Sequence, residues 1–371
     1  MRLRLLATLA ILSTGCSPDL PDGTAHQRAA IQEGTELPDE SFGLSLAEQN
    51  GILAQTVQAN GQVYQGCSAS LVGDRVVVTA AHCLVLNQTA WLEGKEPPRL
   101  GTPATLRYIV GADIRSPTCT LTVKSVTIHP DAKLKNTPES KYFPQAIDHD
   151  IAVVLLDKST LETCRKAQPI GLADNISERS IVDKKLLIGG FGSTDGTYDF
   201  SPKRYWGQIQ GVAVEDQLVV LANIKKGFIS YGDSGTGLLA RGSDGRLITY
   251  GASSIGVEGY TGFQRVDNNL SFIDGVASKD DFCGKAATVG VCLDGRAVNC
   301  SGAGRPLVDD CAADGEVCAV EGGKAVCAAP EPDGGSAGAD AGAEGPQAGD
   351  DDGGCRVAGS TSPSSSGILL G

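Results

Sequence analysis

The chain of 371 residues has little of several residue types that other fold classes need. It contains one methionine, 5% aromatic residues and four histidines, and its 31 basic side chains are outnumbered by 44 acidic ones. The net charge of −13 would repel nucleic-acid phosphates and anionic lipid headgroups, so we expect no nucleic acid among the partners. A single methionine beside 48 glycines argues against a helical bundle and favours a β-rich fold.

No hydrophobic run approaches the roughly 20 residues that span a bilayer as a helix. The run at residues 5–12 follows two arginines and leads into small residues before Cys16. This pattern resembles a bacterial lipoprotein signal, which implies a signal peptide over residues 1–15 and a lipid on Cys16. An ordinary secretory peptide is the alternative. Either predicts export, as an outer-membrane lipoprotein or into the periplasm or the extracellular space.

Export permits disulfides, and half of the 12 cysteines lie between residues 283 and 327. We expect residues 278–329 to form a small module with three disulfides, although six cysteines leave fifteen pairings open. Zinc is disfavoured here because the segment has no CxxC pair and no histidine. The module could bind polysaccharide or another surface partner.

Residues 330–371 consist mainly of glycine, alanine, serine and acidic residues. Such a composition buries too little apolar surface to offset chain entropy, so we expect a disordered acidic tail.

Between residue 31 and about residue 276, short β-branched runs alternate with turn signals, which predicts an all-β barrel or sandwich. Only residues 268–277 have a helical pattern. The strands are expected at residues 51–57, 63–72, 75–79, 121–128, 151–156, 185–188, 217–222 and 247–250.

Three motifs carry chemistry, and they occur in the order His, Asp, Ser. They are TAAHC with His82, DIAVVLL with Asp150, and GDSG with Ser234. In this order they resemble the trypsin/chymotrypsin-like serine peptidases. The resemblance covers residues 31–277 and implies two six-stranded antiparallel β-barrels with a C-terminal helix.

The resemblance also implies a role for each residue. Ser234 would be the nucleophile, His82 the base that removes its proton, and Asp150 the carboxylate that orients the imidazole. The backbone N–H groups of Gly232 and Ser234 would form the oxyanion hole.

The family has a disulfide that matches Cys67 and Cys83, beside the histidine loop. Cys119 and Cys164 then remain in the barrel segment and are expected to pair, which leaves Cys355 unpaired.

The sequence departs from the family near the substrate pocket. Ser230 stands where a cysteine is usual, and Thr236 replaces a glycine. Phe228 occupies the position of the aspartate that binds Arg or Lys, so trypsin-like specificity is disfavoured.

By the same resemblance Ser254 would hydrogen-bond to Asp150, and Gly256 and Gly262 would be open pocket walls. We expect an apolar or small side chain at the cleavage site, unless Phe228 itself fills the pocket.

Residues 16–30 read as a pro-segment. Ile31 matches the family's first mature residue but follows Ala30 instead of a basic residue. If cleavage exposes Ile31, its α-ammonium would pair with Asp233 and order the oxyanion loop. Activation would then release the catalytic domain from a lipid on Cys16.

His129 and His149 also lie near carboxylates, but both are expected on the surface. No metal or organic cofactor is implied. The sequence thus predicts a monomeric, exported serine endopeptidase acting on polypeptides. The alternative is a catalytically inactive peptidase-fold protein that binds partners through its barrels and the cysteine module.

Overall fold

The computed structural model describes residues 31, 34–59, 61–137, 140–193, 200–222, 229–257, 259–277, 283, 290–293, 295–300 and 306–330. The chain divides into two units, Met1–Pro330 and Glu331–Gly371, and all described residues belong to the first. The predictions for the signal peptide, Cys16, the pro-segment, Phe228 and the tail fall outside them. Across these described ranges, no helix has the length and apolar character needed to cross a membrane.

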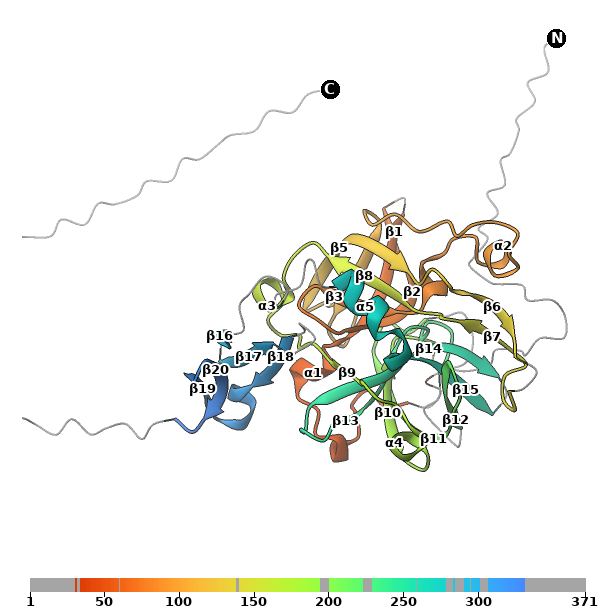
Figure 1. The fold of residues 1–371 in the computed structure, drawn as a ribbon. Helices are drawn as coiled ribbons and strands as arrows, with labels where there is room; N and C mark the ends of the chain where they lie inside the picture. Colours follow the sequence, from red (N-terminus) through yellow and green to blue (C-terminus); the bar gives the residue numbers. More distant parts are fainter. Residues whose placement is uncertain are drawn as a thin grey trace, which may run out of the picture. The chain divides into compact units, whose positions relative to one another are not determined.

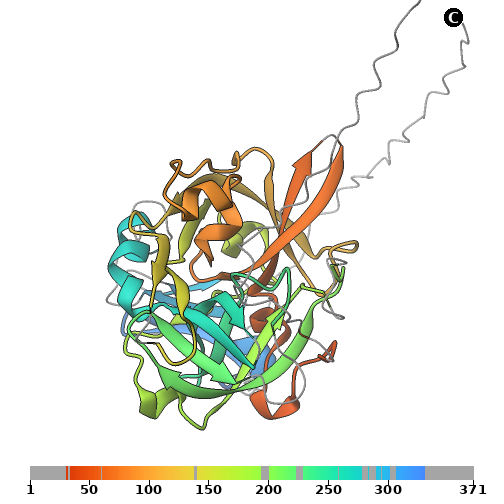
Figure 2. The ribbon, with the colours of Figure 1, turned by 90° about the vertical axis from the view of Figure 1, so that its right-hand side faces the viewer.

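The first barrel is closed by six antiparallel strands in the order β1-β2-β3-β8-β5-β4 (Figure 1). They are β1 (Ile52–Ala59), β2 (Gln62–Leu71), β3 (Val76–Thr79), β4 (Leu106–Val110), β5 (Cys119–Ile128) and β8 (Ala152–Leu156). Five of them lie where the sequence pattern predicted strands, and β4 was not predicted. Figure 2 shows the β1–β2 hairpin extending past the rest of this barrel.

The second barrel has the order β13-β10-β11-β12-β15-β14 and is closed by pairing of β13 with β14. Its strands are β10 (Lys185–Gly190), β11 (Tyr205–Val214), β12 (Leu218–Ala222), β13 (Gly237–Arg241), β14 (Leu247–Val257) and β15 (Tyr260–Arg265). The short β9 (Gly171–Leu172) adds a parallel pairing to β14. The two predicted six-stranded antiparallel barrels are therefore confirmed.

Short elements connect the strands. A hairpin of β6 (Lys133–Asn136) and β7 (Gln145–Asp148) precedes β8. The α-helices are α1 (Leu46–Gln49), α2 (Gln88–Leu92), α3 (Thr160–Thr163), α4 (Glu178–Ile181) and α5 (Leu270–Ala277), and the 3-10 helices are η1 (Glu40–Phe42), η2 (Ala81–Leu84), η3 (Asp267–Asn269) and η4 (Cys311–Asp314). The predicted C-terminal helix corresponds to η3 and α5.

Strand β8 is buried on both faces, which explains its unbroken apolar sequence. Side chains alternate along a strand, so Val154 and Leu156 pack inside the first barrel. Val153 and Leu155 point the other way, into a core formed by side chains from the strands of the second barrel and by Ile273 of α5. The strand therefore belongs to both cores and carries the packing between them.

The cysteine-rich segment forms two small sheets, as seen at the blue end of the ribbon in Figure 1. The strands are β16 (Val291–Leu293), β17 (Arg296–Cys300), β18 (Pro306–Asp310), β19 (Val317–Glu321) and β20 (Lys324–Ala328). Three disulfides hold the segment together: Cys283–Cys300, Cys292–Cys318 and Cys311–Cys327. The three expected bonds are present, in a pairing that the sequence left open.

This segment packs on the peptidase-like part through an apolar contact and a charged one. Leu161 of α3 is 2% exposed and packs with Val298 and Val308. Nearby, Arg246 donates two hydrogen bonds to the carboxylate of Asp309, at 2.9 and 2.7 Å. The module is therefore docked by a buried leucine and a bidentate ion pair.

We predict that Leu161→Ala lowers the free energy of unfolding by about 2–5 kcal/mol, because the truncation leaves a cavity under β17 and β18. The control is Leu37→Ala, since Leu37 is 74% exposed, and its effect should stay within about 0.5 kcal/mol. Urea denaturation of the full chain measures both. Equal, small effects would show that Leu161 is not packed.

Candidate active site

His82 and Asp150 are brought together by the pairing of β3 with β8. His82 lies in η2, three residues after β3 ends, and Asp150 lies two residues before β8 begins. The strands are antiparallel, with Thr79 opposite Ala152, so the end of one is next to the start of the other. Both side chains therefore emerge at one end of a buried strand pair.

The two residues make two hydrogen bonds. Asp150 Oδ2 lies 2.7 Å from His82 Nδ1, and Asp150 Oδ1 accepts the backbone N–H of His82 at 3.0 Å. An ionised carboxylate can only accept, so His82 carries its proton on Nδ1 and presents a lone pair on Nε2. This is the tautomer that a general base requires.

Asp150 is fully buried and is held by two further contacts. Ser254 donates to its Oδ2 at 2.6 Å, and its own N–H donates to Gln264 Oε1 at 3.1 Å. The structure thus brings Ser254 to the carboxylate, where the sequence predicted it. Gln264 was not predicted, because nothing in its local sequence marks it as a partner of a residue 114 positions away.

Opposing effects act on the pKa of His82. Burial lowers this pKa, but the charge of Asp150 and the hydrogen bond to it raise it, and the net shift is upward from 6.5. The imidazolium form is therefore stabilised where a proton would be accepted.

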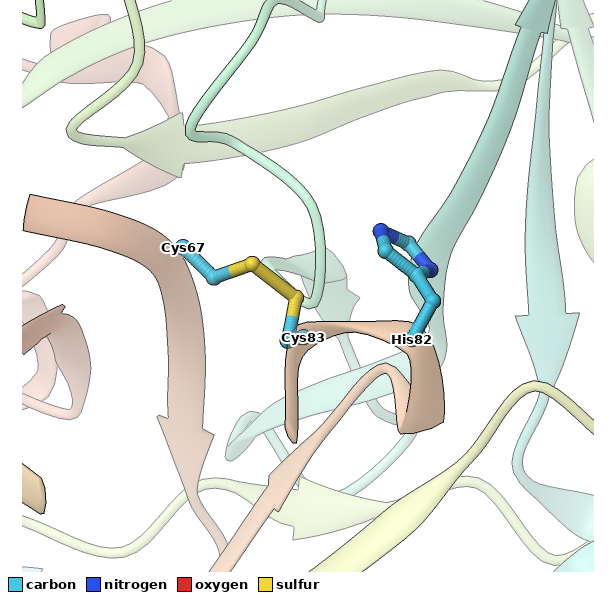
Figure 3. A group of neighbouring side chains, drawn as sticks. All are labelled: Cys67, His82 and Cys83. Carbon is cyan, nitrogen blue, oxygen red and sulfur yellow. A yellow bond between two sulfur atoms is a disulfide. The ribbon is translucent and has the colours of Figure 1, made fainter. Parts of the chain in front are cut away.

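Ser234 lies in the turn before β13, and its backbone is fixed next to the histidine loop. Its carbonyl accepts the N–H of Ser68 at 2.9 Å and lies 3.6 Å from Cys83 Sγ. Cys83 adjoins His82 and is bonded to Cys67, beside Ser68 (Figure 3). The disulfide therefore ties β2, the histidine loop and the Ser234 turn together.

The backbone of the GDSG turn leaves two N–H groups available. Asp233, Gly235 and Thr236 each donate to a backbone carbonyl. Within the described ranges, the N–H groups of Gly232 and Ser234 have no protein acceptor. Gly232 has a φ of +93°, and a Cβ there would lie 2.7 Å from the ring of Phe200, so only glycine fits.

Asp233 is fully buried and accepts three backbone N–H groups. They come from Gly192 at 2.7 Å, Ser230 at 2.9 Å and Ile31 at 3.1 Å. Burial raises the pKa of the carboxyl to about 7, although the three hydrogen bonds lower it. The predicted partners Ile31 and Asp233 are thus in contact, and Ile31 is itself 2% exposed.

The glycines expected as pocket walls differ from each other. Gly256 is half-buried on β14, opposite Thr261 of β15. A Cβ on Gly262 would lie 2.9 Å from Ile255 and 3.1 Å from Phe143. Gly262 was expected to be an open wall, but the space in front of it is filled by these two side chains.

The two departures near the serine have different consequences. Thr236 is fully buried, and its hydroxyl donates to the carbonyl of Gly189, so the position accepts a side chain. Ser230, where the family's cysteine is missing, is buried with no partner for its hydroxyl in the described part of the chain. Cys119 and Cys164, predicted as the remaining pair, are bonded.

Ser68 is a second residue that supports the site and that the sequence did not predict. Its hydroxyl donates to the carbonyl of Gly232 at 2.9 Å and accepts the N–H of Phe191 at 3.1 Å. It therefore connects β2 to the turn that presents Ser234.

Comparison with known proteins agrees with this geometry. The family model described as Trypsin matches residues 47–273. Phenoloxidase-activating factor 3 of Holotrichia diomphalia is 25% identical over 249 residues, which cover 60% of this chain and 66% of that protein. The chain thus spans just under two thirds of the length of this curated relative.

We predict that His82 titrates above pH 6.5 and that Asp150→Asn brings its pKa below 6.5, because the substitution removes the charge and leaves the burial. Imidazole NMR in a Ser234→Ala background measures this without self-digestion. His129 is the internal control, since burial and the nearby His149 lower its pKa. A His82 pKa that does not respond to Asp150→Asn would contradict the assignment.

Proposed function

The chain belongs to the trypsin family, and we propose that it is a serine endopeptidase that hydrolyses polypeptides through an acyl-enzyme. The observation that carries the proposal is the 2.7 Å contact of buried Asp150 with His82, at the end of the strand pair β3–β8. This contact sets the tautomer that a base acting on Ser234 needs.

In the proposed reaction His82 Nε2 takes the proton of the Ser234 hydroxyl as its oxygen attacks the scissile carbonyl. The imidazolium that forms is stabilised by Asp150. His82 then gives the proton to the leaving amine, and water hydrolyses the acyl-enzyme by the same steps.

The N–H groups of Gly232 and Ser234 would bind the oxyanion of each tetrahedral intermediate. Support comes from the lack of a protein acceptor for either group within the described residues. Donors that are already oriented stabilise the transition state by several kcal/mol, because no reorganisation is needed as charge develops.

For specificity we propose an apolar or small residue at the cleavage site, not Arg or Lys. The sequence has Phe228 where a cation-binding carboxylate is expected, and Phe143 and Ile255 fill the space before Gly262. A cationic side chain would find no counter-charge in that wall.

We propose activation by cleavage before Ile31. In the intact chain the Ile31 nitrogen is a neutral peptide N–H, bonded to the buried Asp233. Cleavage would convert this nitrogen to an α-ammonium, which would supply a positive counter-charge to the buried carboxylate. Export is also proposed, because the five disulfides fit an oxidising compartment. If Cys16 carries a lipid, the same cleavage would release the catalytic domain from it.

A binding protein without catalysis is the second candidate. The observations that favour it are the unpartnered Ser230 hydroxyl and the narrowed space at Gly262. Both concern the pocket and leave the His82–Asp150 contact intact, so the peptidase is the function that the geometry supports best.

We predict that a fluorophosphonate labels the protein once per chain, on the species that begins at Ile31, and that Ser234→Ala abolishes the label. Intact mass identifies both the adduct and the N-terminus. The label requires an activated serine, so His82→Ala should also abolish it.

The matched control is Ser230→Ala, which changes a neighbouring buried serine outside the proposed triad and should keep the label. Absence of label on a folded species beginning at Ile31 would refute the peptidase proposal in favour of the binding protein.

We also predict that the unprocessed chain becomes less stable as pH rises from about 4 to 7. The pKa of Asp233 is raised from 3.8 to about 7 by burial, so over this range the folded state keeps a proton that the unfolded state releases. The free energy of unfolding should fall by up to about 4 kcal/mol.

Urea denaturation of the Ser234→Ala chain between pH 4 and 7 measures the fall, and adding Asp233→Asn should remove it. In chains that begin at Ile31 the α-ammonium offsets the negative charge of Asp233. The free energy of unfolding should therefore not decrease with pH below about pH 8. Identical pH profiles before and after processing would exclude the proposed pairing.

A further inference from the structure

The two histidines expected on the surface form a half-buried cluster beside the site. His129 follows β5, and His149 lies between β7 and Asp150. Their rings stack with centroids 4.1 Å apart and planes within 7°. One ligand atom each from His129, His149 and Asp131 all lie within 4.8 Å of one another. The backbone fixes this arrangement, since the N–H of His129 donates to the carbonyl of Ile151 at 3.0 Å.

The ring of His149 is oriented by a partner that the catalytic contacts do not use. Its Nδ1 lies 2.9 Å from Oδ1 of the fully buried Asn269. The amide of Asn269 donates through Nδ2 to the carbonyl of Arg265 at 2.6 Å, so Oδ1 is the atom that faces the histidine. His149 therefore carries its proton on Nδ1 and leaves the Nε2 lone pair free. This is how metal-binding histidines are commonly held.

The backbone of His149 is also unusual. Its φ is +51°, a backbone conformation that residues other than glycine rarely adopt and that is strained for histidine. The ring of His129 is packed edge-on against Phe272, with centroids 4.7 Å apart. Its Nδ1 accepts the N–H of Asp131 at 3.2 Å, a long hydrogen bond that a stronger ligand could replace. Asp131 is exposed, so its carboxylate can rotate toward the two rings.

A second group in the described ranges, Cys67, His82 and Cys83, has a similar spacing but cannot bind metal in the same way. The two sulfurs are joined in a disulfide (Figure 3). His82 Nδ1 is hydrogen-bonded to Asp150. Neither sulfur is available as a thiolate.

We propose that His129, His149 and Asp131 form a binding site for a borderline divalent transition metal, with Zn²⁺ as the best fit. Two imidazoles and one carboxylate suit this class of ion, whereas Ca²⁺ and Mg²⁺ prefer oxygen ligands only. Zinc at about 2.0–2.1 Å from each ligand needs ligand atoms roughly 3.4 Å apart, so the three atoms that now lie within 4.8 Å of one another would have to move closer together. An imidazole binds a metal in the plane of its ring, so the His129 ring would also have to rotate out of the stack until both ring planes meet at the ion. Water would complete the tetrahedron. The site does not depend on peptidase activity.

The test is a titration of the full chain with ZnCl₂ by isothermal calorimetry, in the Ser234→Ala background that prevents self-digestion. We expect the chain to bind one Zn²⁺ at this site. His129→Ala and His149→Asn should each weaken the affinity for Zn²⁺ at least tenfold. Asparagine tolerates a positive φ, so His149→Asn removes the ring while keeping the backbone conformation.

The control is His82→Ala, which removes the histidine of the other cluster and should leave the affinity unchanged. Imidazole NMR adds a direct readout, since Zn²⁺ should shift the His129 and His149 signals and not that of His82. Absence of zinc binding would overturn the proposal. Binding that survives both His129→Ala and His149→Asn would also overturn it, because the metal would then lie elsewhere.

Discussion

The antiparallel pairing of β3 with β8 is the contact on which the rest of the structure depends. β8 is buried on both faces, with alternate side chains in the core of each barrel. A one-residue slip would move Val153 and Leu155 into the first barrel and Val154 and Leu156 out of it, so both cores would have to repack and the register is fixed by their packing. The same register sets Thr79 opposite Ala152 and thereby places His82 beside Asp150. The packing that joins the barrels and the geometry of the candidate base therefore have one cause.

The second constraint is the buried carboxylate of Asp233. A buried carboxyl without a counter-charge favours its neutral form, and three backbone N–H groups only partly offset this. The surrounding glycines show how closely it is enclosed, since a Cβ on Gly190 or Gly192 would collide with it. The ionisation of a carboxyl in such surroundings depends strongly on any new positive charge nearby. The nitrogen of Ile31 is already in contact with the Asp233 carboxyl. One peptide cleavage could thus change the electrostatics of the whole Ser234 turn.

The sequence was sufficient for the parts of the fold that local patterns encode. Alternating β-branched runs marked β1, β2, β5 and β12 to within two residues, and three short motifs located the triad candidates. It failed for the barrel strands β4, β11, β13 and β15, whose sequences mix polar and apolar residues, and for contacts between distant segments. Gln264 at Asp150 and Ser68 at Gly232 depend on the barrel register, which no short motif records. The position of Phe143 before Gly262 has the same origin, so the expected open wall could not have been excluded beforehand.

The histidine cluster follows from the same tertiary register. Viewed along the chain, His149 alternates with Asp150 and was expected to point to solvent. That argument assumes an extended strand, but the backbone at His149 has a positive φ, and Ile151 donates back to the carbonyl of His149 at 2.7 Å. This tight turn sends Asp150 inward to His82 and His149 toward Asn269 and His129. The geometry that aims the carboxylate at the base also gathers three potential metal ligands beside it, so both arrangements depend on one turn of the backbone.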